Sequence, residues 1–162
     1  MEKIGQKFVI LGSMVKFVGD HIAKLDDKGR LVFPSAFKSL MESAGEQAVY
    51  VVKKDLFLPC LNIFTYAEWE LESEQIKQRL NFFNPEHVLF WHQYTSDRAL
   101  VEPDRKIGRI SIPAALLESI GVAKEAVFHG SDHKIELWSR ENFDSSKASP
   151  SDIAALAQKI LG

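Results

Sequence analysis

Residues 25–34, LDDKGRLVFP, contain the pattern from which the fold of this chain can be predicted. Two aspartates, a lysine and a Gly-Arg pair separate two apolar runs, and a proline follows. Aspartate and glycine in this position indicate a hairpin turn, because glycine adopts positive φ freely and aspartate hydrogen-bonds to nearby backbone amides. Pro34 suits the first turn of a helix, where its missing N–H costs nothing. The stretch therefore predicts a strand, a tight charged turn, a second strand and a helix at residues 34–43.

The same order of residues returns at 101–113, VEPDRKIGRISIP, in which Gly108-Arg109 takes the place of Gly29-Arg30. A second helix is predicted at residues 113–120. Gly45 and Gly121 follow the two helices, where glycine commonly ends a helix in the left-handed conformation. A unit of strand, charged turn, strand and helix is therefore predicted twice, and both turns direct cations outward.

The segments around these units also follow a common order. Residues 15–25, 48–53 and 60–65 are rich in β-branched and aromatic residues and predict strands. The strands predicted in the second copy are 126–129 and 134–138. Residues 134–138 followed by 139–143 resemble 62–66 followed by 67–69, so a whole strand-helix-strand-strand-helix order is duplicated. A polar linker at 145–151 leads to a short helix at 152–161.

Two helices are predicted between the copies. Thr65 can cap a helix at 66–83, with Glu68 completing a capping box. Its apolar stripe is Trp69, Ile76, Leu80 and Phe83. Asn84 and Pro85 suit the start of the next helix, so an αα-hairpin is expected there.

Composition limits the possible classes of function. The chain has 162 residues, is 46% hydrophobic and 26% charged, and has a net charge of −2, which indicates a globular protein without a global attraction to nucleic acid. Any such binding would need locally concentrated cations. Cys60 is the only cysteine, which suits a reducing compartment. No apolar run approaches a membrane span, so we expect a cytoplasmic protein.

The two turns in their matching contexts resemble the MraZ family of bacterial transcriptional regulators. The resemblance rests on residues 26–30 with Pro34, on Trp69 after a β run, and on Gly108-Arg109 with Pro113. It extends from about Met14 to Phe143. A single Asp-x-Lys-Gly-Arg pattern is weak evidence, whereas two copies with the same downstream order are strong evidence.

The resemblance implies an α+β fold in which two AbrB/SpoVT-like swapped-hairpin halves interlock as a pseudo-dimer around a small β-barrel. The corresponding divisions of the chain are an N-terminal extension (1–13), a first half with its following helix (14–83), a linking helix (84–98), a second half (99–144), and a linker with a C-terminal helix (145–162).

The resemblance also implies a function. Members bind short direct repeats upstream of the division and cell-wall gene cluster as ring-like homo-oligomers, so the expected partners are double-stranded DNA and further copies of this chain. No cofactor, metal, small-molecule substrate or membrane is implied, and the expected location is the cytoplasm, in association with the nucleoid. Interface candidates for the ring are the apolar faces of helices 66–83 and 85–95.

Site residues follow from the resemblance and from side-chain chemistry. Arginine and lysine contact phosphates and base edges, and the planar guanidinium can do so bidentately. Arg30 and Arg109 are therefore predicted to contact bases or phosphates. Three further cations are predicted to contact phosphates: Lys28, Arg105 and Lys106. The residues expected to shape the turns are Asp26, Gly29 and Gly108. The alternative is a solvated turn with incidental charges.

The second copy departs from the family pattern. Asp104 lies five residues before Arg109, whereas Asp26 lies four residues before Arg30. Aligned on Gly108-Arg109, the aspartate position is occupied by Arg105, which leaves Asp104 outside the expected arrangement.

Other functions have weaker signals. His129 and His133 have the spacing of a metal-binding helical turn, but Gly130-Ser131-Asp132 between them predicts a loop, and no Cys/His cluster completes a zinc site. Cys60 lies in an apolar β context that favours an inert thiol. An antitoxin or interaction module is the main alternative, with residues 145–162 as the partner-binding tail.

Overall fold

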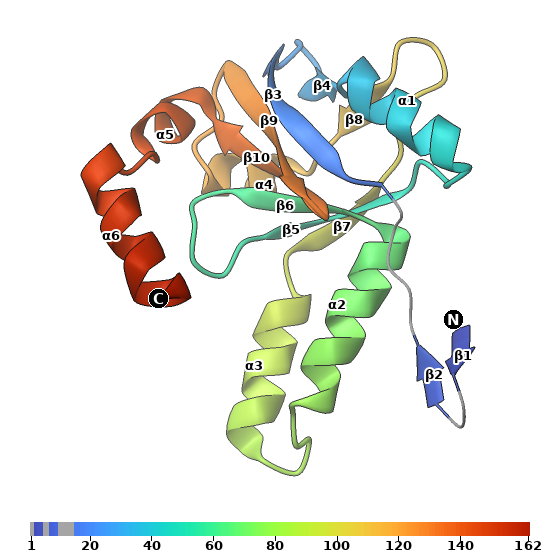
Figure 1. The fold of residues 1–162 in the computed structure, drawn as a ribbon. Helices are drawn as coiled ribbons and strands as arrows, with labels where there is room; N and C mark the ends of the chain where they lie inside the picture. The colour runs from blue at the N-terminus through green and yellow to red at the C-terminus, as the bar shows by residue number, and fades with distance from the viewer. Residues whose placement is uncertain (1, 5–6, 10–14) are drawn as a thin grey trace.

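The computed structural model describes residues 2–4, 7–9 and 15–162. The charged stretch at 25–34 joins strand β3 (Phe17–Lys24) to β4 (Arg30–Val32), and its counterpart joins β7 (Arg98–Val101) to β8 (Arg109–Ser111). Helices and antiparallel strands alternate around them, which confirms the predicted α+β class (Figure 1).

Six strands form one antiparallel sheet in the order β3-β9-β10-β6-β5-β7. The remaining four strands of this sheet beside β3 and β7 are β5 (Tyr50–Lys54), β6 (Leu61–Thr65), β9 (Glu125–Asp132) and β10 (Lys134–Ser139). β4 and β8 form a separate two-stranded ladder. Each of the predicted strands is therefore present.

The strands that flank each charged turn do not pair with each other, so the predicted hairpins are wrong. β3 pairs with β9 over eight residues, β7 pairs with β5, and β4 pairs with β8. The turn itself is tight, with the Asp26 N–H donating to the Arg30 carbonyl at 2.9 Å. Beyond the turn the strands separate, since β3 joins the six-stranded sheet and β4 joins the two-stranded ladder with β8. Strands distant in sequence thus interlock.

The main core lies between the six-stranded sheet and the β4–β8 ladder (Figure 1). Leu31 is opposite Ile110 in that ladder, and both side chains are buried. Successive strand residues point to opposite faces, so Arg30 and Arg109 lie on the outer face. Phe33 continues the inner face and packs against Tyr50 in a tilted contact and against Phe128 edge to face, with ring centroids 4.8 and 5.8 Å away.

Helices α1 (Ser35–Ala44) and α4 (Ala114–Ser119) follow β4 and β8. Pro34 and Pro113 occupy the N-cap positions, one residue before the helices, where no N–H is required. Gly45 and Gly121 adopt φ of 69° and 77° directly after them. The predicted helix ends are thereby confirmed.

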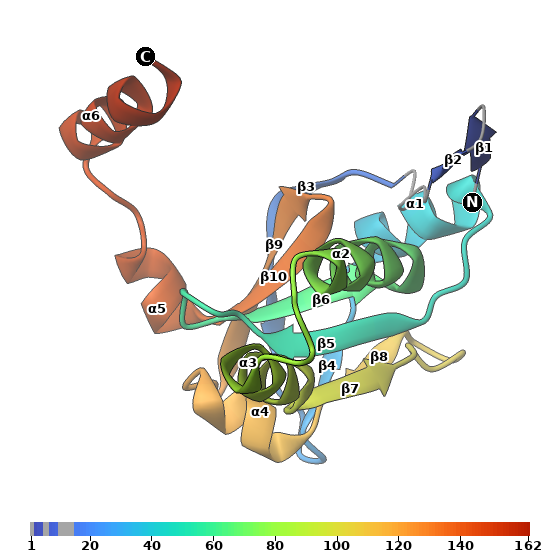
Figure 2. The ribbon, with the colours of Figure 1, turned by 90° about the horizontal axis from the view of Figure 1, so that it is seen from below.

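Helices α2 (Tyr66–Gln78) and α3 (Pro85–Thr95) form the expected αα-hairpin, on the opposite side of the sheet from β4 and β8 (Figures 1 and 2). Thr65 Oγ1 accepts a hydrogen bond from the Glu68 N–H at 3.2 Å, and Asn84 Oδ1 accepts one from the Glu86 N–H at 3.0 Å. Both predicted caps are confirmed.

The predicted length of α2 is wrong, because the helix ends five residues before Phe83. Asn81 donates its N–H to His87 Nδ1 at 2.9 Å and accepts the Phe83 N–H at 3.0 Å, which replaces helical bonds with a local cap. Phe83 is consequently 97% exposed. Only Trp69 and Ile76 of the predicted stripe belong to the cluster that packs this hairpin on the sheet.

The second copy ends in helix α5 (Arg140–Ser145). Ser139 Oγ accepts the Asn142 N–H at 3.1 Å, just as Thr65 accepts that of Glu68. Ser139 is therefore the counterpart of Thr65. The predicted alignment of 134–138 with 62–66 was two residues out of register, because it matched apolar patterns rather than capping residues.

Both chain ends lie apart from the core. Strands β1 (Glu2–Ile4) and β2 (Lys7–Val9) pair with each other, whereas the rest of the expected extension at 1–13 lies outside the described residues. Helix α6 (Pro150–Leu161) begins two residues earlier than predicted, capped by Ser149, and buries no residue (Figure 2). Within the described ranges, none of the helices has the length and apolar character needed to traverse a bilayer.

Truncation at the centre of the ladder should destabilise the whole fold. Leu31→Ala removes a buried side chain opposite Ile110, and such changes cost about 2–5 kcal/mol. Val32→Ala, on the exposed outer face of the same strand, should cost less than about 1 kcal/mol. Urea unfolding of both variants gives the comparison. Equal losses for the two would mean that Leu31 does not anchor the core.

Candidate nucleic-acid interface

The first charged turn is organised by one carboxylate. Asp26 Oδ1 accepts the backbone N–H of Lys28 at 2.9 Å and that of Arg30 at 2.8 Å. Its other oxygen, Oδ2, accepts the Arg30 Nε–H at 2.9 Å. Gly29 has φ of 76°, which glycine adopts without strain. The Asp26 carboxylate and the positive φ of Gly29 together close the turn.

The second turn repeats this arrangement with one more residue. Asp104 Oδ1 accepts three backbone N–H groups, those of Lys106, Ile107 and Gly108, at 3.1, 2.9 and 3.0 Å. Asp104 Oδ2 accepts the Arg109 Nε–H at 2.6 Å. Gly108 has φ of 79°. The second turn is therefore closed by the same carboxylate–amide and carboxylate–guanidinium contacts.

Alignment on the Gly-Arg pair led to the wrong equivalence for the aspartate. Asp104, and not Arg105, corresponds to Asp26. The extra residue of the second turn is accommodated because Asp104 Oδ1 accepts three backbone N–H groups, whereas Asp26 Oδ1 accepts two. Sequence reasoning thus missed Asp104 as a turn-structuring residue. A local signal was available, since an aspartate before a short polar run ending in glycine commonly bonds several following amides.

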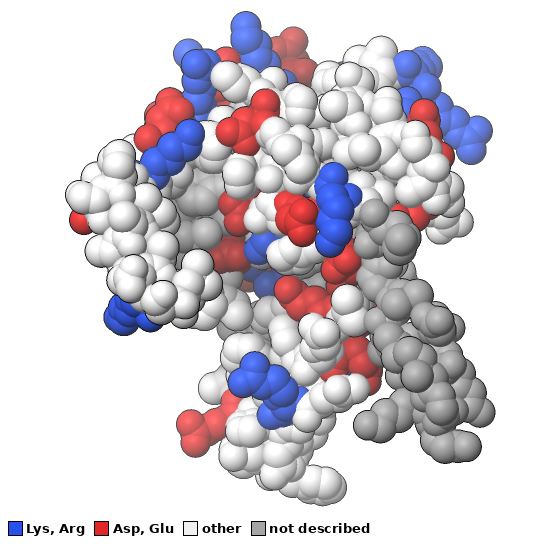
Figure 3. Space-filling model, viewed as in Figure 1, with Lys and Arg blue, Asp and Glu red and all other residues white. Residues whose placement is uncertain are grey.

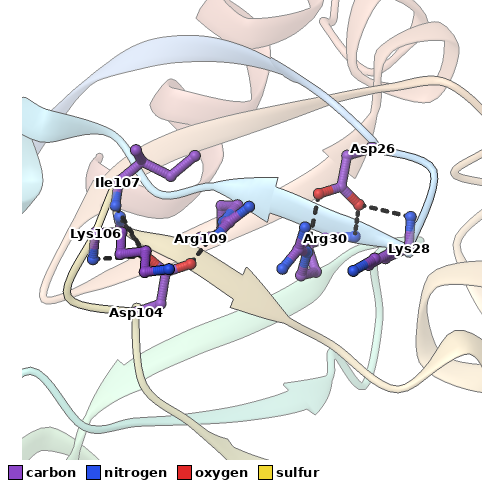
Figure 4. A network of polar contacts seen from close by, with 8 residues as sticks. Asp26, Lys28, Arg30, Asp104, Lys106, Ile107 and Arg109 are labelled. Atoms are coloured by element: carbon purple, nitrogen blue, oxygen red, sulfur yellow. Dashed lines mark hydrogen bonds and ion pairs between the residues drawn. The ribbon is translucent and has the colours of Figure 1, made fainter.

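The β4–β8 ladder connects the two turns, which lie at its opposite ends because each turn precedes one of the two antiparallel strands. Arg30 is opposite Ser111 and Arg109 is opposite Val32, so both arginines project from the outer face close to the centre of the ladder. Figure 4 shows them between the two aspartates, with Arg109 beside Asp104 and Arg30 beside Asp26. Segments that are far apart in the sequence therefore build one continuous polar surface.

The five predicted cations fall into two groups on this surface. Lys28, Arg105 and Lys106 are exposed at the tips. The side chains of Arg30 and Arg109 are only 25% and 24% exposed, and each forms an ion pair with its aspartate. The aspartates compensate these two charges and the exposed Asp27 offsets Lys28, so the net positive charge comes from Arg105 and Lys106 of the second turn.

The turn geometry also affects the aspartates. The backbone N–H of Arg30, followed by its side chain, lowers the pKa of Asp26. The N–H of Ile107, the Arg109 side chain and the N–H of Gly108 hold the pKa of Asp104 well below its usual range. Both carboxylates therefore remain ionised and keep their acceptor oxygens available to the turn at neutral pH.

The weaker catalytic candidates lie away from the turns. His129 belongs to β9, so the loop predicted at 130–132 is wrong, and its Nδ1 lies 2.7 Å from Asp20 Oδ1. In the described parts of the chain, no group of three potential metal ligands comes together. Cys60 is buried, and burial raises the pKa of its thiol to about 12. A thiol with that pKa is protonated at neutral pH and is a poor nucleophile.

Comparison with known proteins gives the family. A family model described as "MraZ protein, putative antitoxin-like" matches residues 95–158. The chain is 32% identical over 148 residues to a protein of Bacteroides thetaiotaomicron named transcriptional regulator MraZ, across 91% of this chain and 94% of that protein. The chain belongs to the MraZ family. MraZ relatives from Bacteroides fragilis and Hydrogenovibrio crunogenus are 33% and 32% identical, across 91% and 88% of this chain and 92% of each of those proteins.

Loss of the Asp104 charge should lower the free energy of unfolding of this chain at neutral pH, and by less in acid. The folded-state pKa of Asp104 lies below the unfolded value of about 3.9, so its stabilising contribution is complete above that pH and is lost as pH falls toward the folded pKa. Wild type should therefore be more stable than Asp104→Asn at pH 7, and the difference should narrow below about pH 4.

Urea unfolding midpoints between pH 7 and pH 3 measure this difference. Asp27→Asn, at an exposed position of the first turn, serves as the control and should stay close to wild type throughout. A stability difference for Asp104→Asn that did not change with pH would contradict the proposed role of the ionised carboxylate.

Proposed function

We propose that this chain is a sequence-specific DNA-binding transcriptional regulator that binds short direct repeats as a ring-like homo-oligomer and performs no catalysis. The observation that carries the proposal is the pair of aspartate-braced turns at opposite ends of the β4–β8 ladder, whose arginines share its outer face. The name of the relatives, transcriptional regulator MraZ, supports the same class.

The proposed fold is a pair of interlocked swapped-hairpin halves that form a pseudo-dimer with a small β-barrel. The exchange of partners supports it, because β3, β4 and β5 all pair with strands of the second copy. The halves are 14–83 and 99–144, with 84–98 as the linking helix and 145–162 as the tail. Leu31 opposite Ile110, and Asn62 opposite Glu136, lie on the pseudo-two-fold axis.

Lys28, Arg105 and Lys106 are the proposed phosphate contacts. They are exposed, and cations at phosphates release counterions from DNA, which is the main source of non-specific affinity. Arg30 and Arg109 use Nε to hold their aspartates, which orients the outer Nη groups of each guanidinium. These groups are the proposed contacts to bases or phosphates, since arginine can bond guanine in the major groove.

Self-assembly would compensate for the low charge of a single chain. A single protomer has a net charge of −2 and therefore no overall attraction to DNA. A ring presents many turns at once, which raises their effective concentration on tandem sites. The α2–α3 hairpin projects at the end of the molecule opposite the turns (Figure 1). Its tip exposes Phe82, Phe83, Val88 and Leu89, which makes it the proposed ring interface.

The direct repeats are expected upstream of the division and cell-wall gene cluster, and the protein is expected in the cytoplasm in association with the nucleoid.

A second candidate function, an antitoxin-like interaction module, is favoured by α6. This helix exposes Ile153, Leu156 and Ile160 along one side, and the matched family model includes it up to residue 158. If this chain captures a co-transcribed protein, and if deletion of α6 abolishes that capture, the antitoxin-like function is supported over DNA binding alone.

Removal of two tip cations tests the DNA-binding surface. Lys28→Ala/Arg105→Ala should weaken binding to a direct-repeat duplex and reduce the slope of log affinity against log salt by about 0.9 for each lost phosphate contact. Lys77→Ala, in α2, should leave both quantities unchanged. Fluorescence anisotropy at several salt concentrations measures them. Wild-type binding by the double variant would count against the proposal.

Substitution at the hairpin tip tests the assembly. Phe83 and Leu89 are 97% and 67% exposed, so Phe83→Ser/Leu89→Ser should leave the fold intact while removing apolar contact area between subunits. We expect a shift toward single protomers in sedimentation velocity. Val18→Ser, an equally exposed site on β3, is the control. A ring that persists in the double variant would exclude this interface.

A further inference from the structure

A groove of about 530 Å³ lies beside the second turn. Three lysines line it from three different elements: Lys24 from β3, Lys38 from α1 and Lys106 from the second turn. On the face shown in Figure 3, basic side chains lie in separate groups at the two sides of the upper edge, with carboxylates beside them. The groove therefore lies at the same end of the molecule as the charged turns.

The groove is electrostatically one-sided. None of its lining residues is an aspartate or a glutamate. Across the described residues, Lys24, Lys38 and Lys106 take part in no ion pair, whereas Arg30 and Arg109 are paired. Glu125 is opposite Lys24 in the β3–β9 ladder, but its carboxylate contacts Arg140 at 3.1 Å. Three uncompensated cations on a chain of net charge −2 form a local anion-attracting surface.

Apolar side chains form most of the remaining wall of the groove, together with His21 and Ser35. Ile22, Val32 and Ile107 line it and are 55%, 48% and 58% exposed. A DNA backbone alternates charged phosphates with the apolar faces of deoxyribose. Lysines interleaved with exposed aliphatic side chains match that alternation better than they match a small free anion.

Among the described residues, the pseudo-symmetric positions of the other half do not carry the same set of lysines. With Pro113 placed on Pro34, Lys38 corresponds to Leu117, which is buried, and with Asp104 placed on Asp26, Lys24 corresponds to Glu102. Ile107 is the extra residue of the second turn, so the first turn has no side chain that corresponds to it. Within the described residues, this set of three lysines is therefore not repeated at the pseudo-symmetric position.

We propose that this groove binds the DNA backbone flanking the turns and thereby fixes the direction in which each protomer lies on its repeat. The proposal rests on the DNA-binding function proposed above. Two similar turns related by a pseudo-two-fold axis could bind a site in either orientation. Direct repeats, unlike palindromes, require one orientation, and a contact present on one side only selects it.

The first experiment measures the backbone contact. Lys24→Gln/Lys38→Gln should bind a direct-repeat duplex more weakly than wild type, and the slope of log affinity against log salt should fall by about 1.8, or about 0.9 for each lost contact. Lys77→Gln/Lys159→Gln removes the same charge elsewhere and should keep the wild-type slope. Unfolding midpoints establish whether both double variants fold. If Lys24→Gln/Lys38→Gln does not fold, the single variant Lys24→Gln is measured in its place.

The second experiment measures orientation on a duplex with a single repeat. A Glu118→Cys substitution on the exposed side of α4 carries an iron–EDTA group, while the buried Cys60 stays unlabelled. With wild-type lysines, cleavage should fall on one side of the repeat. With Lys24→Gln/Lys38→Gln it should fall on both sides, because the two orientations become closer in free energy.

The outcomes separate the two proposals. If Lys28→Ala/Arg105→Ala weakens binding but the groove variant keeps the wild-type slope and one-sided cleavage, the groove proposal is wrong and the DNA-binding function stands. If the wild-type protein binds no repeat duplex at any salt concentration, both are overturned. A reduced slope together with two-sided cleavage supports both.

Discussion

The contact of Leu31 with Ile110 across the β4–β8 ladder is the constraint on which the rest of the molecule depends. These residues lie at the centre of the ladder, and their burial closes the core over the six-stranded sheet. Because strand residues alternate between faces, burying them places Arg30 and Arg109 outside. The same interaction therefore stabilises the fold and positions the candidate interface.

The aspartate brace explains how a cationic surface can be rigid. Each carboxylate bonds two or three backbone amides and one guanidinium, so most of the turn is held by a single side chain. This ordering reduces the net positive charge of the turns, because each aspartate neutralises one arginine. What remains positive is the tip of the second turn and, beside it, the lysine groove. An acidic chain can thus present local cations without a basic composition.

Sequence patterns were reliable where the deciding interactions are local. Gly45 ends α1 and Thr65 caps α2, because each needs only residues within one turn of helix. Patterns failed where the partner is distant or where an alternative local bond intervenes. The pairing of β3 with β9 cannot be read from the charged turn between β3 and β4, and the Asn81–His87 hydrogen bond ends α2 although the apolar stripe continues.

The sequence by itself determined the repeated unit, the two charged turns, the caps and the family resemblance, because these depend on residue type and short spacing. Only the tertiary structure decided that β4 pairs with β8, that Asp104 holds the second turn as Asp26 holds the first despite an extra residue, and that Lys24, Lys38 and Lys106 meet in one groove. Those features depend on which apolar surfaces are buried together, and that is a property of the whole chain rather than of any segment.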